Sequence, residues 1–170
     1  MAFADALARS PGMVKRQIAV FAAPVLDYFS DLADADVAGK HGVISVVGSE
    51  SDGLLPALLR QHAGRNALHF AEGENSGHSL IEYGWNHTTL QALKIDKTLT
   101  YRQTAYAADN YQQQALALEA QLSDEVMSHI EFLRDMNGTI TCSGLPLVRY
   151  RDEDRLNAIM DIYRANGVKI

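Results

Sequence analysis

The fold is decided by the stretch EVMSHIEFLRDMNGTITCSGLPLVR, residues 125–149. Two runs rich in apolar and β-branched residues, 125–134 and 139–149, flank Asn137-Gly138. Asn-Gly between two such runs is the strongest short-range signal for a β-hairpin, because both residues reach positive φ at little cost. The stretch therefore predicts two paired strands joined through Asn137-Gly138.

The segments on either side of this hairpin extend it into a larger unit. Residues 98–106 alternate as a strand does, and a helix is predicted from 109 to 122. After the hairpin, Asp152 caps a helix that ends at Asn166-Gly167, and residues 168–170 begin another strand. From residue 98 onward the order is β-α-β-β-α-β, which is the split βαβ unit of ferredoxin-like folds.

The first half of the chain also alternates strands and helices. We predict strands at 13–21, 42–48 and 66–71, and helices at 3–9, at 24–33, from Ser49 or Ser51 to Gln61, and at 79–94 with Leu80, Ile81, Leu90 and Leu93 inward. The polar stretch 72–78 (EGENSGH) is the predicted loop or boundary between two sub-lobes, 1–72 and 79–170. The predicted fold class is α+β: a single ferredoxin-like domain, residues 1–170, with an antiparallel or mixed sheet and helices packed on one face.

Composition narrows the classes of function. The chain has 170 residues, 47% of them hydrophobic, and a net charge of −6 with no basic stripe, so nucleic acid is not an expected partner. The longest apolar run, 18–26, falls far short of the roughly 20 residues that span a bilayer, so no membrane association is expected. The single cysteine, Cys142, rules out an internal disulfide and suits a reducing, cytoplasmic compartment.

No established catalytic signature is present. The sequence lacks G-x-G-x-x-G, a P-loop, G-x-S-x-G and C-x-x-C. Without a glycine-rich phosphate loop, the chain has no visible means of holding a dinucleotide by itself.

His129 and Glu131 are the candidate catalytic residues. Residues two apart on a strand point to the same face, so the imidazole and the carboxylate are expected side by side. Such a pair suits a general base or two ligands of a divalent metal, but spacing identifies no third ligand and we assign no metal. An ordinary structural His–Glu pair is the more common use of this pattern.

Polar residues elsewhere are candidates for substrate binding. Asn86 and His87 belong to the string Trp85-Asn86-His87-Thr88-Thr89, which suits either a polar pocket or a helix cap. A further set could contact a ligand or simply lie on a polar surface: Tyr101, Gln103 and Arg149.

Two segments carry a family resemblance. Residues 83–103 (YGWNHTTLQALKIDKTLTYRQ) and 126–170 (VMSHIEFLRDMNGTITCSGLPLVRYRDEDRLNAIMDIYRANGVKI) resemble the substrate-side, or cap, domain of FAD-linked oxidases of the vanillyl-alcohol-oxidase type. The resemblance implies an FAD-dependent oxidoreductase acting on a small alcohol, phenol or hydroxy acid. The flavin-binding domain is absent from this sequence, so FAD would come from that domain in cis or in trans, and the chain alone is expected to be inactive.

The resemblance also implies a common pocket. His87, His129, Glu131 and Arg149 are expected to converge on one concave surface facing the flavin. Two other functions stay open: a stand-alone ferredoxin-like module that binds a small molecule, possibly as a homodimer, and a flavin-independent enzyme built on His129 and Glu131.

Overall fold

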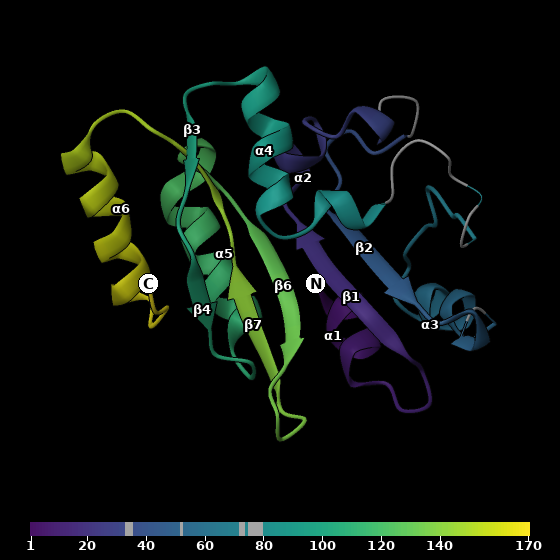
Figure 1. Cartoon of the computed structure of the whole chain (residues 1–170). Coiled ribbons are helices and arrows are strands. Elements are labelled where there is room, and N and C mark those ends of the chain that lie inside the picture. The colour runs from purple at the N-terminus through teal and green to yellow at the C-terminus, as the bar shows by residue number, and fades with distance from the viewer. Residues whose placement is uncertain (33–35, 52, 72–73, 75–79) are drawn as a thin grey trace.

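The computed structural model describes residues 1–32, 36–51, 53–71, 74 and 80–170. Within them the chain forms two antiparallel sheets (Figure 1). The larger sheet has the strand order β2-β1-β6-β7-β4, with bounds Gly42–Val47, Lys15–Phe21, His129–Arg134, Ile140–Gly144 and Thr104–Tyr106. The smaller sheet has the order β3-β8-β5, with bounds Leu99–Tyr101, Leu147–Arg149 and Val126–Met127. The α+β class and the antiparallel sheet are therefore confirmed.

The β-α-β-β-α-β order of the second half is also present. β6 pairs with β7, which closes the predicted hairpin, and Gly138 in its turn has a φ of 79°. β7 pairs with β4, and Lys169 adds an isolated antiparallel bridge to Ala105 on the far side of β4. β1 and β2 then extend the sheet beyond β6.

Each of the three long predicted strands is split between the two sheets. The strand predicted at 98–106 breaks at residues 102–103, the one at 125–134 breaks at Ser128, and the one at 139–149 breaks at Leu145-Pro146. Proline has no amide hydrogen to donate to a strand ladder, so the break at Pro146 follows from its chemistry. The three breaks lie beside one another: Leu145 donates to the carbonyl of His129, which immediately follows Ser128, and β4 begins at Thr104 opposite Gly144.

The helices cover the two faces of the large sheet unequally. Three helices, α1 (Ala2–Arg9), α5 (Tyr111–Leu122) and α6 (Glu153–Ala165), pack on the face formed by Val20, Ile130 and Cys142. On the opposite face, α2 (Ala23–Leu26) and α4 (Asn86–Ile95) pack against Ala19 and Phe21. We call this second face the front face; Figure 1 views it with α1 and α5 behind the sheet and α4 in front of its upper part.

Several predictions for the first half are wrong. Residues 66–71 contain no strand. The helix predicted from residue 79 begins only at Asn86, after a short 3₁₀ turn at Leu80–Tyr83, and both Ile81 and Leu90 are exposed. The helix predicted from Ser49 or Ser51 starts later, as α3 (Leu55–Gln61), because Ser49–Ser51 forms a short 3₁₀ turn. Of the predicted loop 72–78, all but Glu74 lies outside the described residues.

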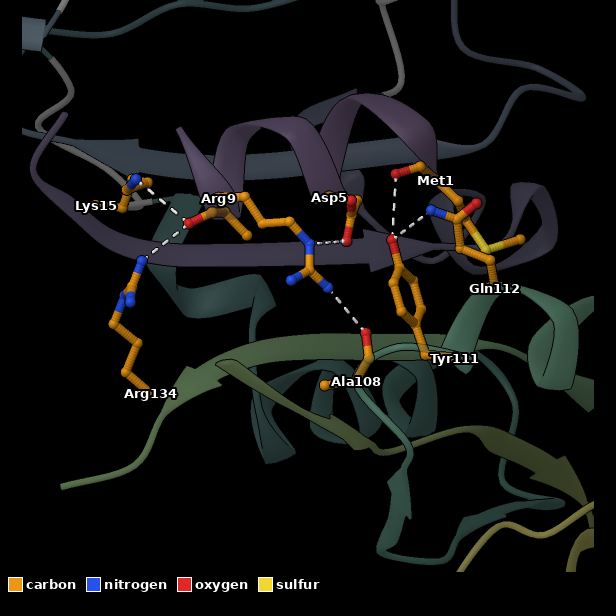
Figure 2. A network of polar contacts seen from close by, with 9 residues as sticks. Met1, Asp5, Arg9, Lys15, Ala108, Tyr111, Gln112 and Arg134 are labelled. Atoms are coloured by element: carbon orange, nitrogen blue, oxygen red, sulfur yellow. Dashed lines mark hydrogen bonds and ion pairs between the residues drawn. The ribbon is translucent and has the colours of Figure 1, made fainter. Parts of the chain in front are cut away.

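The helix α1 is tied to the rest of the domain at both of its ends (Figure 2). At its C-terminal end, the carbonyl of Ala8 accepts hydrogen bonds from Lys15 at 3.4 Å and from Arg134 at 3.1 Å. Arg9, the last residue of the helix, pairs with Asp5 and also donates to the carbonyl of Ala108, and at the N-terminal end the hydroxyl of Tyr111 donates to the carbonyl of Met1 at 3.4 Å. Cations at a helix C-terminus complement its partial negative charge, which stabilises this docking.

No helix in the described ranges is long and apolar enough to cross a membrane.

Candidate functional site

His129 and Glu131 form a buried pair on the front face. The Nε2 atom of His129 lies 2.8 Å from Oε1 of Glu131, and the two side chains are 0% and 1% exposed. Their side-by-side placement is the one that the strand spacing predicted. The imidazole stacks on the ring of Phe21, with centroids 4.5 Å apart, because Phe21 pairs with His129 across β1 and β6.

The proton on His129 follows from its surroundings. Nδ1 is buried and has no hydrogen-bond partner among the described residues. A buried N–H without an acceptor is costly, so the tautomer that fits carries its hydrogen on Nε2 and donates it to Glu131.

The same carboxylate oxygen holds the turn that precedes α4. The backbone N–H of Trp85 donates to Oε1 of Glu131 at 2.8 Å. Directly before it, Gly84 lies against the sheet so closely that a Cβ there would overlap the side-chain nitrogen of Gln17. Gln17 is itself buried, and its Nε2 has no partner in the described chain.

Trp85 has an unusual backbone. Its φ of 53° and ψ of −144° place it in a region that glycine prefers. A tryptophan in such a conformation costs about 1–3 kcal/mol, and it persists only where its surroundings fix it. A hydrogen bond contributes about 0.5–1.5 kcal/mol net, so the bond to Glu131 offsets part of this strain.

Asn86 and His87 open α4 and are exposed, as is the side chain of Trp85 at 44%. The N–H groups of His87 and Thr88 bond to the carbonyls of Gly84 and Trp85. The hydroxyl of Thr88 donates to the carbonyl of Tyr83. The first turn of α4 thus presents one aromatic and two polar side chains to solvent on a backbone that is internally bonded.

Beyond this turn, the front face is uncovered. Ser143 pairs in register with Glu131, and the next positions outward are Thr141, Leu133 and Ala105. Thr141 and Ala105 are exposed and Leu133 is half-buried. In Figure 1 the lower parts of β4, β6 and β7 carry no helix in front of them. The uncovered front face, which we define by Leu133, Thr141 and Ala105, therefore begins where the segment Trp85–His87 ends.

Arg149 does not join the His129–Glu131 pair. It lies on β8 in the smaller sheet, where its guanidinium bonds to Asp96 at 2.9 Å and to the carbonyl of Asp124 at 3.2 Å. Two hydrogen bonds from Thr98, together with the charge of Arg149, hold the pKa of Asp96 below its usual value. Arg149 is thus engaged in linking the end of α4 to β8.

The four residues predicted to converge do not line one open surface. His129 and Glu131 are sealed from solvent, whereas His87 and Arg149 are exposed on α4 and β8. The four side chains do not share a surface because α2 and α4 cover the part of the front face that carries His129 and Glu131. Tyr101 is half-buried at the end of β3, and Gln103 is exposed in the break between β3 and β4.

A cleft of about 350 Å³ lies behind the sheet, between α1 and the start of α5. Asp5, Arg9 and Asn110 line it. Figure 2 shows Arg9 already bonded to Asp5 and to Ala108 at this place. Arg9 is therefore already paired, and its bonds join α1 to the loop before α5.

Three positions that matter at the site could not be grouped from the sequence. Gln17, Gly84 and Ser143 come from different segments and meet only because β1, β6, β7 and the turn before α4 are brought together. The positive φ of Trp85 was equally unforeseen, because tryptophan has no preference for it. Gly84 beside the only tryptophan was the one available hint of a turn.

The first turns of α4 and α6 do not fit the pyrophosphate of FAD. An anion of this kind needs free backbone N–H groups at a helix N-terminus or a glycine-rich loop. At α4 the N–H groups of Trp85, His87 and Thr88 are all used, and α6 begins with the acidic run Asp152-Glu153-Asp154. Within the described part of the chain, no group of three or more His, Cys, Asp or Glu side chains is placed to hold a metal ion.

No protein-family model matches this chain, and no curated protein matches its sequence.

Proposed function

We propose that this chain is the substrate-side domain of an FAD-dependent oxidoreductase that acts on a small alcohol, phenol or hydroxy acid. The observation that carries the proposal is the uncovered front face, bordered by Trp85, Asn86 and His87. A domain that covers a flavin needs such a face, and here it lies beside three exposed side chains, one aromatic and two able to form hydrogen bonds.

The chemistry of this border suits the proposed substrates. An exposed indole offers a flat apolar surface for a phenol or an alkyl chain. An amide and an imidazole supply donors and acceptors for a hydroxyl or a carboxylate. Small-molecule sites commonly combine an apolar wall with a few polar groups in this way.

The resemblance to vanillyl-alcohol-type oxidases supports the same face. Its first segment, 83–103, spans the turn at Gly84, α4 and β3. Its second segment, 126–170, spans β5 to β8 and α6. Together these segments include the strands β6 and β7 of the uncovered front face and the residues at its border.

In this proposal FAD is held wholly by a separate flavin-binding domain, in cis or in trans, because the first turns of α4 and α6 do not fit its pyrophosphate. The flavin would supply the redox chemistry. The residues of this chain would bind the substrate, orient its hydroxyl and exclude water. Asn86 and His87 take the substrate-contacting roles, since His129 and Glu131 are not accessible in this structure.

The coding sequence on the 5′ side of the Met1 codon provides the first test. The proposal expects an in-frame flavin-binding domain there, or a separate flavoprotein that co-purifies with this chain. The purified assembly should show flavin absorbance that is bleached by a small alcohol, phenol or hydroxy acid. An isolated reading frame whose product recruits no flavoprotein would overturn the proposal.

A thermal-shift screen separates this function from the stand-alone binding module. The 170-residue chain alone should be colourless, and its melting temperature should not respond to alcohols, phenols or hydroxy acids, because half of the pocket is missing. A saturable stabilisation by one such compound, in the absence of any flavoprotein, would favour the stand-alone module instead.

A further inference from the structure

The backbone of Trp85 is held in its strained conformation from within the sheet. Its φ of 53° is one of three positive values at non-glycine residues in the described chain. The turn has no side-chain cap at the start of α4. The bond that reaches it from outside the segment is the one from its N–H to Glu131, 46 residues away in sequence.

Glu131 is in turn held by His129. The imidazole Nε2 contacts the same oxygen that accepts the bond from Trp85, and it is the only hydrogen bond of this ring in the described residues. Stacking on Phe21 fixes the plane of the ring. The carboxylate therefore has little freedom to turn away from Trp85.

The segment before Trp85 is seated on the same spot. Gly84 lies against the side chains of Gln17 and Glu131, with the position of a Cβ only 3.1 Å from Oε1 of Glu131. Tyr83 is 2% exposed and stacks on Phe29 with a centroid distance of 4.2 Å. The inner side of the turn is thus fixed, while the indole of Trp85 remains exposed outside it.

We propose that Glu131, supported by His129, is a positioning residue: its buried carboxylate clamps Trp85 and so sets the first turn of α4 at the edge of the uncovered front face. The consequence for substrate recognition by Asn86 and His87 rests on the proposed function. The clamp itself does not, since it concerns contacts within this chain.

Trp85 is the only tryptophan, so its fluorescence reports on the clamp directly. In the full chain, Glu131→Ala should increase acrylamide quenching of Trp85. Loss of the hydrogen bond to Glu131 should also speed hydrogen exchange at the Trp85 amide by roughly 10-fold, without a matching change in the strands of the sheet.

Conservative variants separate positioning from general stability. Glu131→Gln keeps an oxygen that accepts the Trp85 N–H, and it should restore most of the exchange protection. Ser143→Ala is the matched control, because Ser143 is buried opposite Glu131 on β7 and its hydroxyl donates to the carbonyl of Thr104. It should leave both the quenching and the Trp85 exchange unchanged.

His129→Phe provides a second variant if Glu131→Ala does not fold. It keeps the stacking on Phe21 and removes only the donor to Glu131, so Trp85 exchange should rise by a smaller factor than in Glu131→Ala. The proposal is wrong if folded Glu131→Ala and His129→Phe both show wild-type quenching and exchange, or if Glu131→Gln behaves like Glu131→Ala.

These measurements need neither flavin nor substrate. If Trp85 becomes mobile in Glu131→Ala but the wild-type chain recruits no flavoprotein, the clamp is supported and the proposed function is wrong. If Trp85 is unchanged in Glu131→Ala but the wild-type chain recruits a flavoprotein, the clamp is wrong and the proposed function is supported.

Discussion

Gly84→Ala should displace the turn before α4, because the new methyl group has no room. It would overlap the amide nitrogen of Gln17 and come within 3.1 Å of Oε1 of Glu131. Gln17 is 8% exposed, so its side chain cannot simply swing into solvent. Overpacking of this kind costs about 1–3 kcal/mol, and we expect about 2 kcal/mol here because the clash meets two buried polar groups.

Gln17→Ala should rescue this variant. Removing the amide vacates the space that the methyl group needs, so the double variant should regain about 1–2 kcal/mol relative to the sum of the single variants. Gln17→Ala alone should change the free energy of unfolding by less than about 1 kcal/mol, since the lost packing is offset by removal of an unpartnered buried donor.

Urea unfolding followed by far-UV circular dichroism measures these differences. With a slope of about 2 kcal/mol/M, Gly84→Ala should lower the midpoint by about 1 M. Gly53→Ala is the matched control, because nothing lies within 4 Å of a Cβ at Gly53, and its midpoint should hardly move. If the double variant is as unstable as the two single effects added together, Gly84 and Gln17 do not compete for one space and the reasoning fails.

Three other predictions follow from the contacts around the sheet. Arg134→Met removes one of the two cations on the carbonyl of Ala8 and should lower the free energy of unfolding by about 0.3–1 kcal/mol, an effect that 1 M salt should reduce in urea titrations. Arg155 holds the pKa of Glu125 below its usual 4.5, so the pair stabilises the fold above that pH and this contribution disappears as pH falls through the folded-state pKa. Arg155→Met should therefore lower the melting temperature at pH 7 but not in strongly acidic buffer. An equal loss at both pH values would contradict this. Burial raises the pKa of the Cys142 thiol to about 12, so a disulfide reagent at pH 8 should label it only as fast as the protein opens, whereas rapid labelling of the native protein would show that Cys142 is accessible.

The second half of the fold follows from short-range chemistry. Gly138 supplies the positive φ that closes the hairpin, and the side chain of Asp152 accepts from the N–H of Arg155 as a helix cap should. Such signals act within a few residues and can be read from one sequence. The splitting of the strands could not, apart from Pro146, because it depends on how the two sheets bend past each other.

The first half was harder because its segments are short and are fixed by distant partners. Leu90 sits at a helical spacing that predicts burial, yet it is exposed because α4 buries Thr88, Thr89 and Ala92 instead. The helix starts seven residues later than predicted from its apolar pattern, because Trp85 leaves the helical region. That conformation is set by Glu131, and no local rule connects two residues 46 positions apart.

The candidate site shows the same division between what is local and what is not. Strand parity placed His129 beside Glu131, which the structure confirms, but it could not say whether the pair faced solvent. The pattern contained a clue. Met127 and Leu133 share the parity of the pair, and Ile130 and Phe132 have the opposite parity, so both faces carry apolar residues, as expected of a strand covered on both sides. Two polar groups in such a strand cost more to bury than a pair of apolar side chains of the same volume. Stability alone therefore does not explain the His129–Glu131 pair. The pair also fixes the strained backbone of Trp85 at the edge of the uncovered front face, and apolar residues could not accept that hydrogen bond.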